Sequence, residues 1–170
     1  VGSLLSRMRE LATQSASGTL GTTERSYLDQ EFVALRSEID RIATTTEYNG
    51  QPLLSGSSNT FEVFIGFKSG SGNSLNVALD DLDVAAVGLT GASVSTATAA
   101  QSMLAKIDSA ISAVATARAN YGSIQSRFEV AIQNLTVTAE NFTAAESRIR
   151  DADIAQETSV FTKNQILTQS

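Results

Sequence analysis

The 170-residue chain contains no cysteine, no histidine and no tryptophan, and it has one proline. Without cysteine it cannot form disulfides or thiolate metal sites. Without histidine it lacks the usual proton shuttle at neutral pH and the commonest zinc ligand. Aromatic residues make up only 6% of the chain, although 42% of its residues are hydrophobic. This balance favours thin, closely packed helices over a wide globule.

Long apolar runs and an excess of positive charge are missing as well. No apolar stretch approaches the roughly 20 residues that a membrane-spanning helix needs. The net charge is −6, which disfavours attraction to nucleic acid or to anionic lipid. We therefore expect no nucleic-acid partner and no membrane insertion, and nothing in the composition calls for a cofactor.

Helical periodicity is present near both ends of the sequence. It is already running at Leu4, Met8 and Leu11, and it is still running at Ile166 and Leu167. The first residue is valine, and it is not followed by the basic and apolar regions of a secretory signal. We expect the chain to be a piece of a longer protein.

Two amphipathic helices are predicted in the first third of the chain, at residues 3–16 and 23–44. The first carries on one face Leu4, Met8, Leu11, Ala12 and Ser15. The second carries Leu28, Phe32, Leu35, Ile39 and Ile42. The glycines of residues 17–22 separate them, and the segment 47–59, with an Asn-Gly pair and the proline, ends the second. Arg36 and Asp40 lie one turn apart on its polar side.

Apolar residues then alternate in residues 60–68 and 74–80, and the glycine-rich segment 69–73 lies between them. This pattern predicts one β-hairpin. A connector rich in serine, threonine, alanine and glycine follows at about 84–98.

From residue 99 onward, apolar residues alternate steps of three and four over six heptads, which predicts a long coiled-coil-like helix. We expect it to lie along the two shorter helices and to bury Ile107, Ile111, Phe128, Ile132 and Leu135. The predicted fold class is mainly α: an elongated antiparallel helical bundle or coiled-coil rod with one β-hairpin. The heptad positions are Leu104, Ile107, Ile111, Val114, Arg118, Tyr121, Gln125, Phe128, Ile132, Leu135, Ala139, Phe142, Glu146 and Ile149.

Two candidate sites of chemistry have simpler structural interpretations. Asp80, Asp81 and Asp83 lack the glycine and terminal glutamate of an EF-hand loop, so we interpret them as solvated residues at a strand end. The glycine-rich residues 66–73 lack the Gly-Lys-Ser/Thr of a phosphate-binding loop. They are interpreted as a hairpin turn.

Four carboxylates near the end of the chain could suggest acid–base catalysis: Glu146, Asp151, Asp153 and Glu157. Arginines lie within helical reach of three of them, in the pairs Glu146–Arg150, Arg148–Asp151 and Arg150–Asp153. Such pairs keep carboxylates ionised and at the surface, whereas a catalytic acid needs an apolar pocket that raises its pKa. The sequence predicts no catalytic, cofactor-binding or metal-binding residues and no enzyme.

Residues 8–19, 38–54 and 140–167 closely resemble bacterial flagellin. The last segment is the most specific, because a generic coiled coil does not require Ser-Arg-Ile-Arg-Asp-Ala-Asp followed by Phe-Thr-Lys-Asn-Gln-Ile-Leu. The hairpin at 61–79 and the helix at 99–139 are similar to the middle of the flagellin core. The resemblance covers nearly the whole chain.

The resemblance implies one elongated flagellin core domain over residues 1–170. Its parts would be an N-terminal helical part at 1–58, a hairpin and connector at 59–98 in place of the outer domains, and a C-terminal long helix at 99–170. It also implies a secreted, extracellular structural subunit of the flagellar filament. Its partners would be other flagellin subunits, an export chaperone, and cap and junction proteins.

In many flagellins an innate immune receptor, Toll-like receptor 5, recognises an arginine and a leucine of the first helix and a glutamate of the second. The resemblance transfers these roles to Arg7, Leu11 and Glu31, and Leu11 could equally be a core residue. Two alternatives stay open: a hook–filament junction protein, and a flagellin-like surface protein that binds polysaccharide or a host surface. For surface binding, Phe61, Phe64, Phe67 and Lys68 are the candidate residues.

Overall fold

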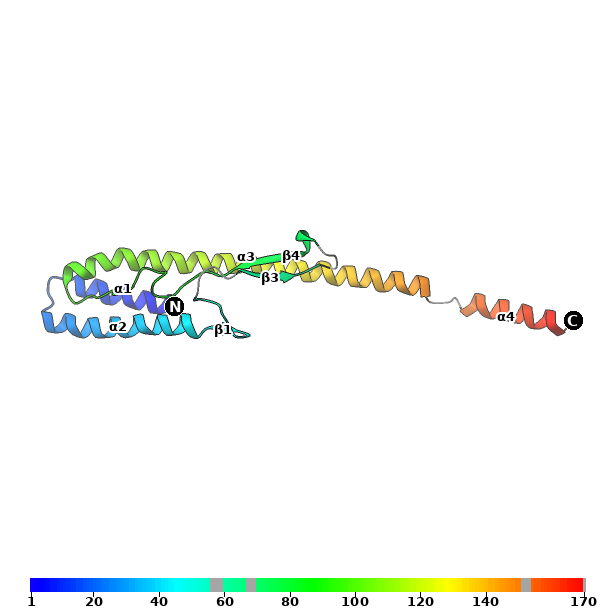
Figure 1. The fold of residues 1–170 in the computed structure, drawn as a ribbon, viewed down its shortest axis with the longest axis horizontal. Coiled ribbons are helices and arrows are strands. Elements are labelled where there is room, and N and C mark those ends of the chain that lie inside the picture. The colour runs from blue at the N-terminus through cyan, green and yellow to red at the C-terminus, as the bar shows by residue number, and fades with distance from the viewer. Residues whose placement is uncertain (56–59, 67–69, 151–153, 170) are drawn as a thin grey trace. The chain divides into compact units, whose positions relative to one another are not determined.

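The structure is a computed structural model that describes residues 1–55, 60–66, 70–150 and 154–169 (Figure 1). The described helices are α1 (Gly2–Ala16), α2 (Thr22–Thr45), α3 (Ala97–Arg150) and α4 (Ile154–Gln169). The strands are β1 (Glu47–Tyr48), β2 (Gln51–Pro52), β3 (Thr60–Phe64) and β4 (Ser74–Ala78), and a short 3-10 turn, η1, covers Ser71–Asn73. The predicted mainly helical fold is confirmed. The chain forms two compact units, Val1–Arg127 and Phe128–Ser170.

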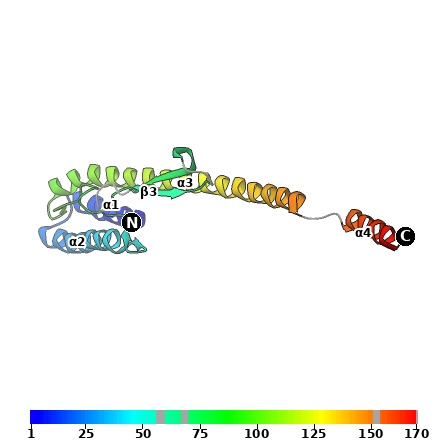
Figure 2. The same ribbon diagram turned by 45° about the vertical axis from the view of Figure 1, so that its right-hand side comes forward.

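In the first unit, α1, α2 and the first part of α3 lie side by side, and α1 runs antiparallel to both neighbours (Figures 1 and 2). A single arginine organises the turn between α1 and α2. Arg25 donates hydrogen bonds to the carbonyl oxygens of Ser15 at 2.9 Å, Ser17 at 2.7 Å and Leu20 at 2.7 Å. Carbonyls at a helix C-terminus have no partner within the helix. Arg25 therefore completes the end of α1 and fixes the turn that follows.

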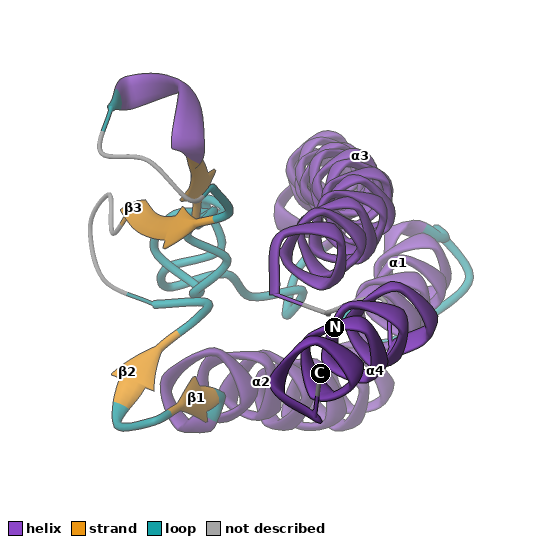
Figure 3. Ribbon diagram, turned by 90° about the vertical axis from the view of Figure 1, so that its right-hand side faces the viewer, coloured by secondary structure: helices purple, strands orange, loops and turns teal. Residues whose placement is uncertain are grey.

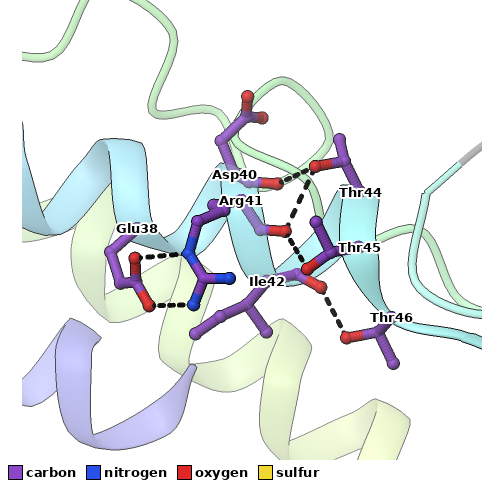
Figure 4. A network of polar contacts seen from close by, with 7 residues as sticks. All are labelled: Glu38, Asp40, Arg41, Ile42, Thr44, Thr45 and Thr46. Atoms are coloured by element: carbon purple, nitrogen blue, oxygen red, sulfur yellow. Dashed lines mark hydrogen bonds and ion pairs between the residues drawn. The ribbon is translucent and has the colours of Figure 1, made fainter.

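Threonine hydroxyls complete the C-terminal end of α2 (Figure 4). The hydroxyl of Thr44 donates to the carbonyl of Asp40 at 2.8 Å, and that of Thr45 donates to the carbonyl of Arg41 at 2.6 Å. The Thr46 hydroxyl and backbone N–H both donate to Ile42, at 2.5 and 3.0 Å. These back-bonds satisfy the last carbonyls of the helix, and the backbone of Thr46 is extended, so α2 ends here.

Apolar side chains from all three helices meet in one core. The fully buried side chains include Leu5, Met8 and Leu11 of α1, Phe32 and Ile39 of α2, and Ile107 of α3. The predicted helices match α1 and α2 to within a residue at each end. Two face assignments are shifted: Leu5 rather than Leu4 is fully buried in α1, and Ala43 rather than Ile42 is buried near the end of α2.

Residues 83–95, called the strap below, run from the β4 side of the molecule to the start of α3. The sequence identified this region only as a connector, but it is packed into the helical core. Its buried residues are Val87, Leu89, Ala92 and Val94. Gly88 and Gly91 take positive φ values of 73° and 65°, which glycine adopts without steric cost. These two turns let the strap direct its apolar side chains inward.

Two antiparallel strand pairs are present in the described residues, not one (Figure 3). The predicted hairpin is β3 with β4, in which Phe61 faces Val77 and Val63 faces Leu75. The additional pair, β1 with β2, closes around Asn49 and Gly50, whose φ values are 53° and 73°. Positive φ at both turn residues is typical of the two-residue Asn-Gly hairpin turn, so the Asn-Gly pair does more than end a helix.

The long helix is confirmed as α3, but part of its predicted burial is wrong. The buried residues of α3 are Ala100, Met103, Ile107, Ala110, Val114 and Ala117. Ile111 is half-buried against the core and Phe128 is half-buried, whereas Ile132 and Leu135 are exposed. The predicted burial assumed cover along the entire helix. The buried residues of α3 all lie within residues 97–127, the part of the helix that belongs to the same compact unit as α1 and α2.

In the second unit, α3 ends at Arg150 and α4 begins at Ile154. None of the residues 128–150 and 154–168 is buried. Two of the four candidate carboxylates, Asp151 and Asp153, lie outside the described residues, as do Phe67 and Lys68 of the hairpin.

Candidate interaction surfaces

Arg7 and Glu31, for which the resemblance to flagellin implies receptor recognition, lie together across the α1–α2 interface. A guanidinium nitrogen of Arg7 is 2.8 Å from the Glu31 carboxylate, and a second nitrogen of Arg7 donates to the same oxygen at 2.8 Å. Both side chains are about half exposed. The antiparallel helices bring together two residues that are 24 positions apart in the sequence, and the pair is accessible to a partner.

Glu10 also contacts Arg7, at 3.0 Å on the same helix. The hydrogen bond to Glu31, and then the one to Glu10, raises the pKa of Arg7 above its ordinary value. An arginine guanidinium is charged at any physiological pH, so this cluster carries one positive and two negative groups. An exposed ion pair contributes little to stability, so its position at the surface matters more than its energy.

Leu11, the third residue assigned to recognition, is placed differently. Its side chain is 1% exposed and belongs to the hydrophobic core. Leu11 sits one helical turn beyond Arg7, and its packing holds this part of α1 in place. Arg7 and Glu31 are thus presented to solvent, whereas Leu11 is buried in the core.

A second interhelical ion pair, which the sequence did not predict, lies on the neighbouring side of α1. Arg9 approaches the Asp108 carboxylate of α3 to 2.8 Å, and both side chains are more than half exposed. No local signal could have revealed the pair, because its partners are 99 residues apart and meet only once α1 lies against α3.

The aspartates at 80, 81 and 83 are half-buried and structural rather than solvated. Asp83 accepts a hydrogen bond from the backbone N–H of Ala86 at 2.7 Å, and Asp81 accepts one from the N–H of Asp83 at 3.3 Å. The N–H of Asp80 donates to the Tyr121 hydroxyl at 2.9 Å. The prediction that the three aspartates are simply solvated is therefore wrong. Their carboxylates and backbone N–H groups form hydrogen bonds that shape the start of the strap. Within the described residues, no group of acidic side chains is arranged to hold a metal ion.

Of the four candidate carboxylates near the end of the chain, Glu146 and Glu157 lie within the described residues, and both are at the surface. Arg150 lies 3.2 Å from Glu146, as predicted, and both side chains are mostly exposed. Glu157 of α4 is exposed as well. These residues have the ordinary environment of charged residues on a helix surface.

The second unit exposes a series of large apolar side chains. In α3 they are Val130, Ile132, Leu135, Val137, Phe142 and Ile149, and in α4 they are Ile154, Val160, Phe161, Ile166 and Leu167. Large exposed apolar surfaces on a protein usually mark an interaction site. Among the described helices, none is long and apolar enough to cross a bilayer.

Comparison with known proteins connects these surfaces to a family. Residues 1–59 match the model of the bacterial flagellin N-terminal helical region, and residues 104–170 match that of the C-terminal helical region. The protein YvzB of Bacillus subtilis, which is named as a flagellin, is 42% identical over 140 residues, covering 81% of this chain and 86% of that protein. The chain belongs to the bacterial flagellin family.

Other flagellins match over the full chain. A flagellin of Halalkalibacterium halodurans is 40% identical over 170 residues, which is 100% of this chain and 62% of that protein. Flagellin FlaB1 of Treponema pallidum is 36% identical over 181 residues, covering 98% of this chain and 63% of that protein. This flagellin chain therefore spans less than two thirds of the length of those two relatives.

A solved flagellin structure agrees with the fold. The crystal structure of Bacillus cereus flagellin matches with a TM-score of 0.68 at 32% identity, covering 85% of this chain and 82% of that one. The flagellin family consists of structural proteins rather than enzymes, as the sequence led us to expect.

Proposed function

We propose that this flagellin chain is part of a structural subunit of the flagellar filament, which polymerises for motility. The observation that carries the proposal is the exposed apolar surface of the second unit, together with family membership. Burial of apolar surface contributes about 25 cal/mol per Å². A surface of this kind gains its cover when neighbouring subunits associate.

The proposal implies a location and a set of partners. The subunit would be secreted and extracellular, and other flagellin subunits would be its principal partners. An export chaperone and the cap and junction proteins would be transient or terminal partners. Residues 1–170 would act as one core domain, in which residues 59–98 stand in place of outer domains.

Electron microscopy of the full-length gene product after salt-induced polymerisation tests this function. We expect filaments from the unmodified protein and shorter or fewer filaments from Ile132→Ser and Phe142→Ser variants. Thr136→Ser, on the same part of α3, is the matched control because it keeps an exposed polar side chain. Amorphous aggregates or monomers from the unmodified protein under filament-forming conditions would contradict the proposal.

We also propose that the Arg7–Glu31 pair, supported by Leu11, is recognised by Toll-like receptor 5. The support is geometric: the two charged side chains lie 2.8 Å apart on one accessible surface. Arginine at such a position can serve as an interface anchor. The role of Leu11 is to hold α1 in register beneath them.

Receptor signalling by single variants tests this recognition. Arg7→Ala and Glu31→Ala should weaken signalling while circular dichroism and thermal unfolding stay unchanged, because the pair is exposed. Arg41→Ala removes an arginine from a different ion pair and is the matched control. A full response from the double variant Arg7→Ala/Glu31→Ala would remove the assignment. Loss of helicity in step with signalling would make the residues structural.

A further inference from the structure

We propose that the strap, residues 83–95, opens and closes as one unit, and that the Asp29 carboxylate of α2 holds it closed. The strap connects to α3 and carries four buried apolar residues, yet it contains no α-helix or β-strand. A segment of this kind is joined to the core by few bonds, so each of them has a large influence on whether it stays in place.

The strap is organised internally by its own backbone. Val87 N–H donates to Asp83 at 3.1 Å, Leu89 N–H donates to Val84 at 2.9 Å, and Ala92 N–H donates to Leu89 at 3.1 Å. These bonds link its successive turns to one another. Cooperative opening of contiguous segments is a general property of native proteins, and a segment whose turns are linked in this way is suited to move as one.

The bonds that fasten the strap backbone to the described helices all run through side chains. Asp29 accepts the N–H of Val94 at 2.6 Å and the hydroxyl of Ser93 at 2.8 Å. Arg36 donates to the carbonyl of Ala92 at 2.7 Å. Among these, only Asp29 holds two strap groups at once, and a hydrogen bond to a charged acceptor is stronger than one between neutral groups.

Ser15 of α1 also holds the strap, through a hydrogen bond to Val94. It is fully buried, and its hydroxyl donates to the carbonyl of Val94, while its own carbonyl accepts from Arg25. Both backbone groups of Val94 are therefore held, one by α2 and one by α1. Release of Asp29 leaves the N–H of Val94 without its acceptor inside the core, where an unpaired donor is costly.

The hydrogen bonds of Asp29 and Ser15 to Val94 lie at one end of the first unit. Ser15 lies near the C-terminus of α1, Asp29 lies in the first half of α2, and Val94 precedes the start of α3 at Ala97. Closing the strap thus joins all three helices where the α1–α2 turn and the beginning of α3 come together. Opening would uncover the buried side chains of Leu89 and Val94 while the helices remain folded.

Native-state hydrogen exchange on the 170-residue chain measures this opening directly. In Asp29→Ala, the amides of Val87, Leu89, Ala92 and Val94 should exchange faster by a common factor, roughly ten- to a hundredfold. Amides in the middle of α2 should change much less. Asp40→Asn, on the same helix and without a hydrogen bond to the strap in the described structure, should leave all of these rates unchanged.

The milder variant Asp29→Asn keeps the test valid if Asp29→Ala does not fold. Asparagine retains an acceptor oxygen but removes the charge, so the strap amides should again accelerate together, by a smaller factor. Acceleration of Val94 alone would overturn the claim that the strap moves as one unit. Equal acceleration throughout the first unit would overturn the claim that it opens separately from the helices.

The absence of native cysteine allows an independent measurement. In Leu89→Cys, a thiol reagent can react only when the strap opens, because Leu89 is fully buried. Adding Asp29→Asn should raise the labelling rate severalfold or more. Ile39→Cys, equally buried but within α2, is the control and should keep its rate. Equal increases in labelling rate at both positions, or no increase at Leu89→Cys, would refute the claim that Asp29 holds the strap closed.

Discussion

Residues 97–127 of α3 belong to one compact unit and residues 128–150 to the other, and the two stretches differ sharply in burial. In the first, Ile107 is completely buried among side chains of α1 and α2. In the second, Ile132 occupies the same heptad spacing and is 61% exposed. Heptad spacing thus identifies the apolar face of a helix. It does not identify whether another part of the same chain buries that face.

The same contrast explains how the two units use apolar residues. In the first unit, the apolar face of α3 is buried against α1, α2 and the strap. The second unit leaves Phe142 of α3 and Phe161 of α4 about two-thirds exposed. Such side chains contribute little to the folding of the free chain, and under the proposed function they would contribute to association between subunits.

The largest expected effect comes from truncating matched isoleucines in the two parts of α3. Ile107→Ala should destabilise the chain by about 2–5 kcal/mol, because it leaves a cavity in a closed core. Ile132→Ala should change stability by less than about 0.5 kcal/mol, because water already reaches the side chain. Urea unfolding at low protein concentration, followed by circular dichroism, measures both. Equal losses would mean that the second unit is covered in the free chain.

Much of this contrast could not be read from the sequence. The bounds of α1 and α2 followed from periodicity, and so did the presence of the β3–β4 hairpin, because each element is long enough to show a repeat. The predicted segments of the hairpin, 60–68 and 74–80, extend beyond the strands Thr60–Phe64 and Ser74–Ala78. The β1–β2 pair was missed because strands of two residues are too short to show alternation. The strap was missed because its four buried residues follow neither a helical nor a strand period.

The candidate recognition surface was predictable only through the resemblance to flagellin. Residues Arg7 and Glu31 came from aligned segments, and their pairing depends on the antiparallel arrangement of α1 and α2. The burial of Leu11 was partly foreseeable, since it lies on the apolar face of residues 3–16. The Arg9–Asp108 pair depends on the tertiary position of α3, which spacing along the chain does not encode.

An intermediate effect is expected from deleting hydroxyl groups. Ser15→Ala removes the buried partner of the Val94 carbonyl and should cost about 1–3 kcal/mol, because that oxygen then has no donor in the core. Thr143→Ala in the second unit removes an exposed back-bond to Ala139 and should be nearly neutral, since water replaces it. Thermal unfolding of both variants measures the difference. A neutral Ser15→Ala would show that water reaches Val94.

The smallest expected effect concerns surface charge, where an ion pair in each unit differs in the number of contacts that it makes. Arg41 makes two contacts with the Glu38 carboxylate, at 2.8 and 2.6 Å (Figure 4), whereas Arg150 makes one contact with Glu146 at 3.2 Å. The hydrogen bond from Arg41 lowers the pKa of Glu38 below its ordinary value. A lowered folded-state pKa means that the pair stabilises the fold above the unfolded-state pKa of glutamate.

That stabilisation should be lost as the pH falls through the lowered pKa of Glu38, because the protonated carboxyl no longer pairs with Arg41. In Arg41→Gln, the NMR titration of Glu38 should therefore shift to higher pH, towards the ordinary value for glutamate. The stability difference between this variant and the unmodified chain should be small near neutral pH, since both side chains are exposed, and should vanish in acid. Arg150→Gln is the matched control, because it removes the arginine of the Arg150–Glu146 pair in the second unit and should leave the Glu38 titration unchanged. An unshifted Glu38 titration in Arg41→Gln would show that the two-contact geometry does not persist in solution, and the difference between these two ion pairs would then disappear.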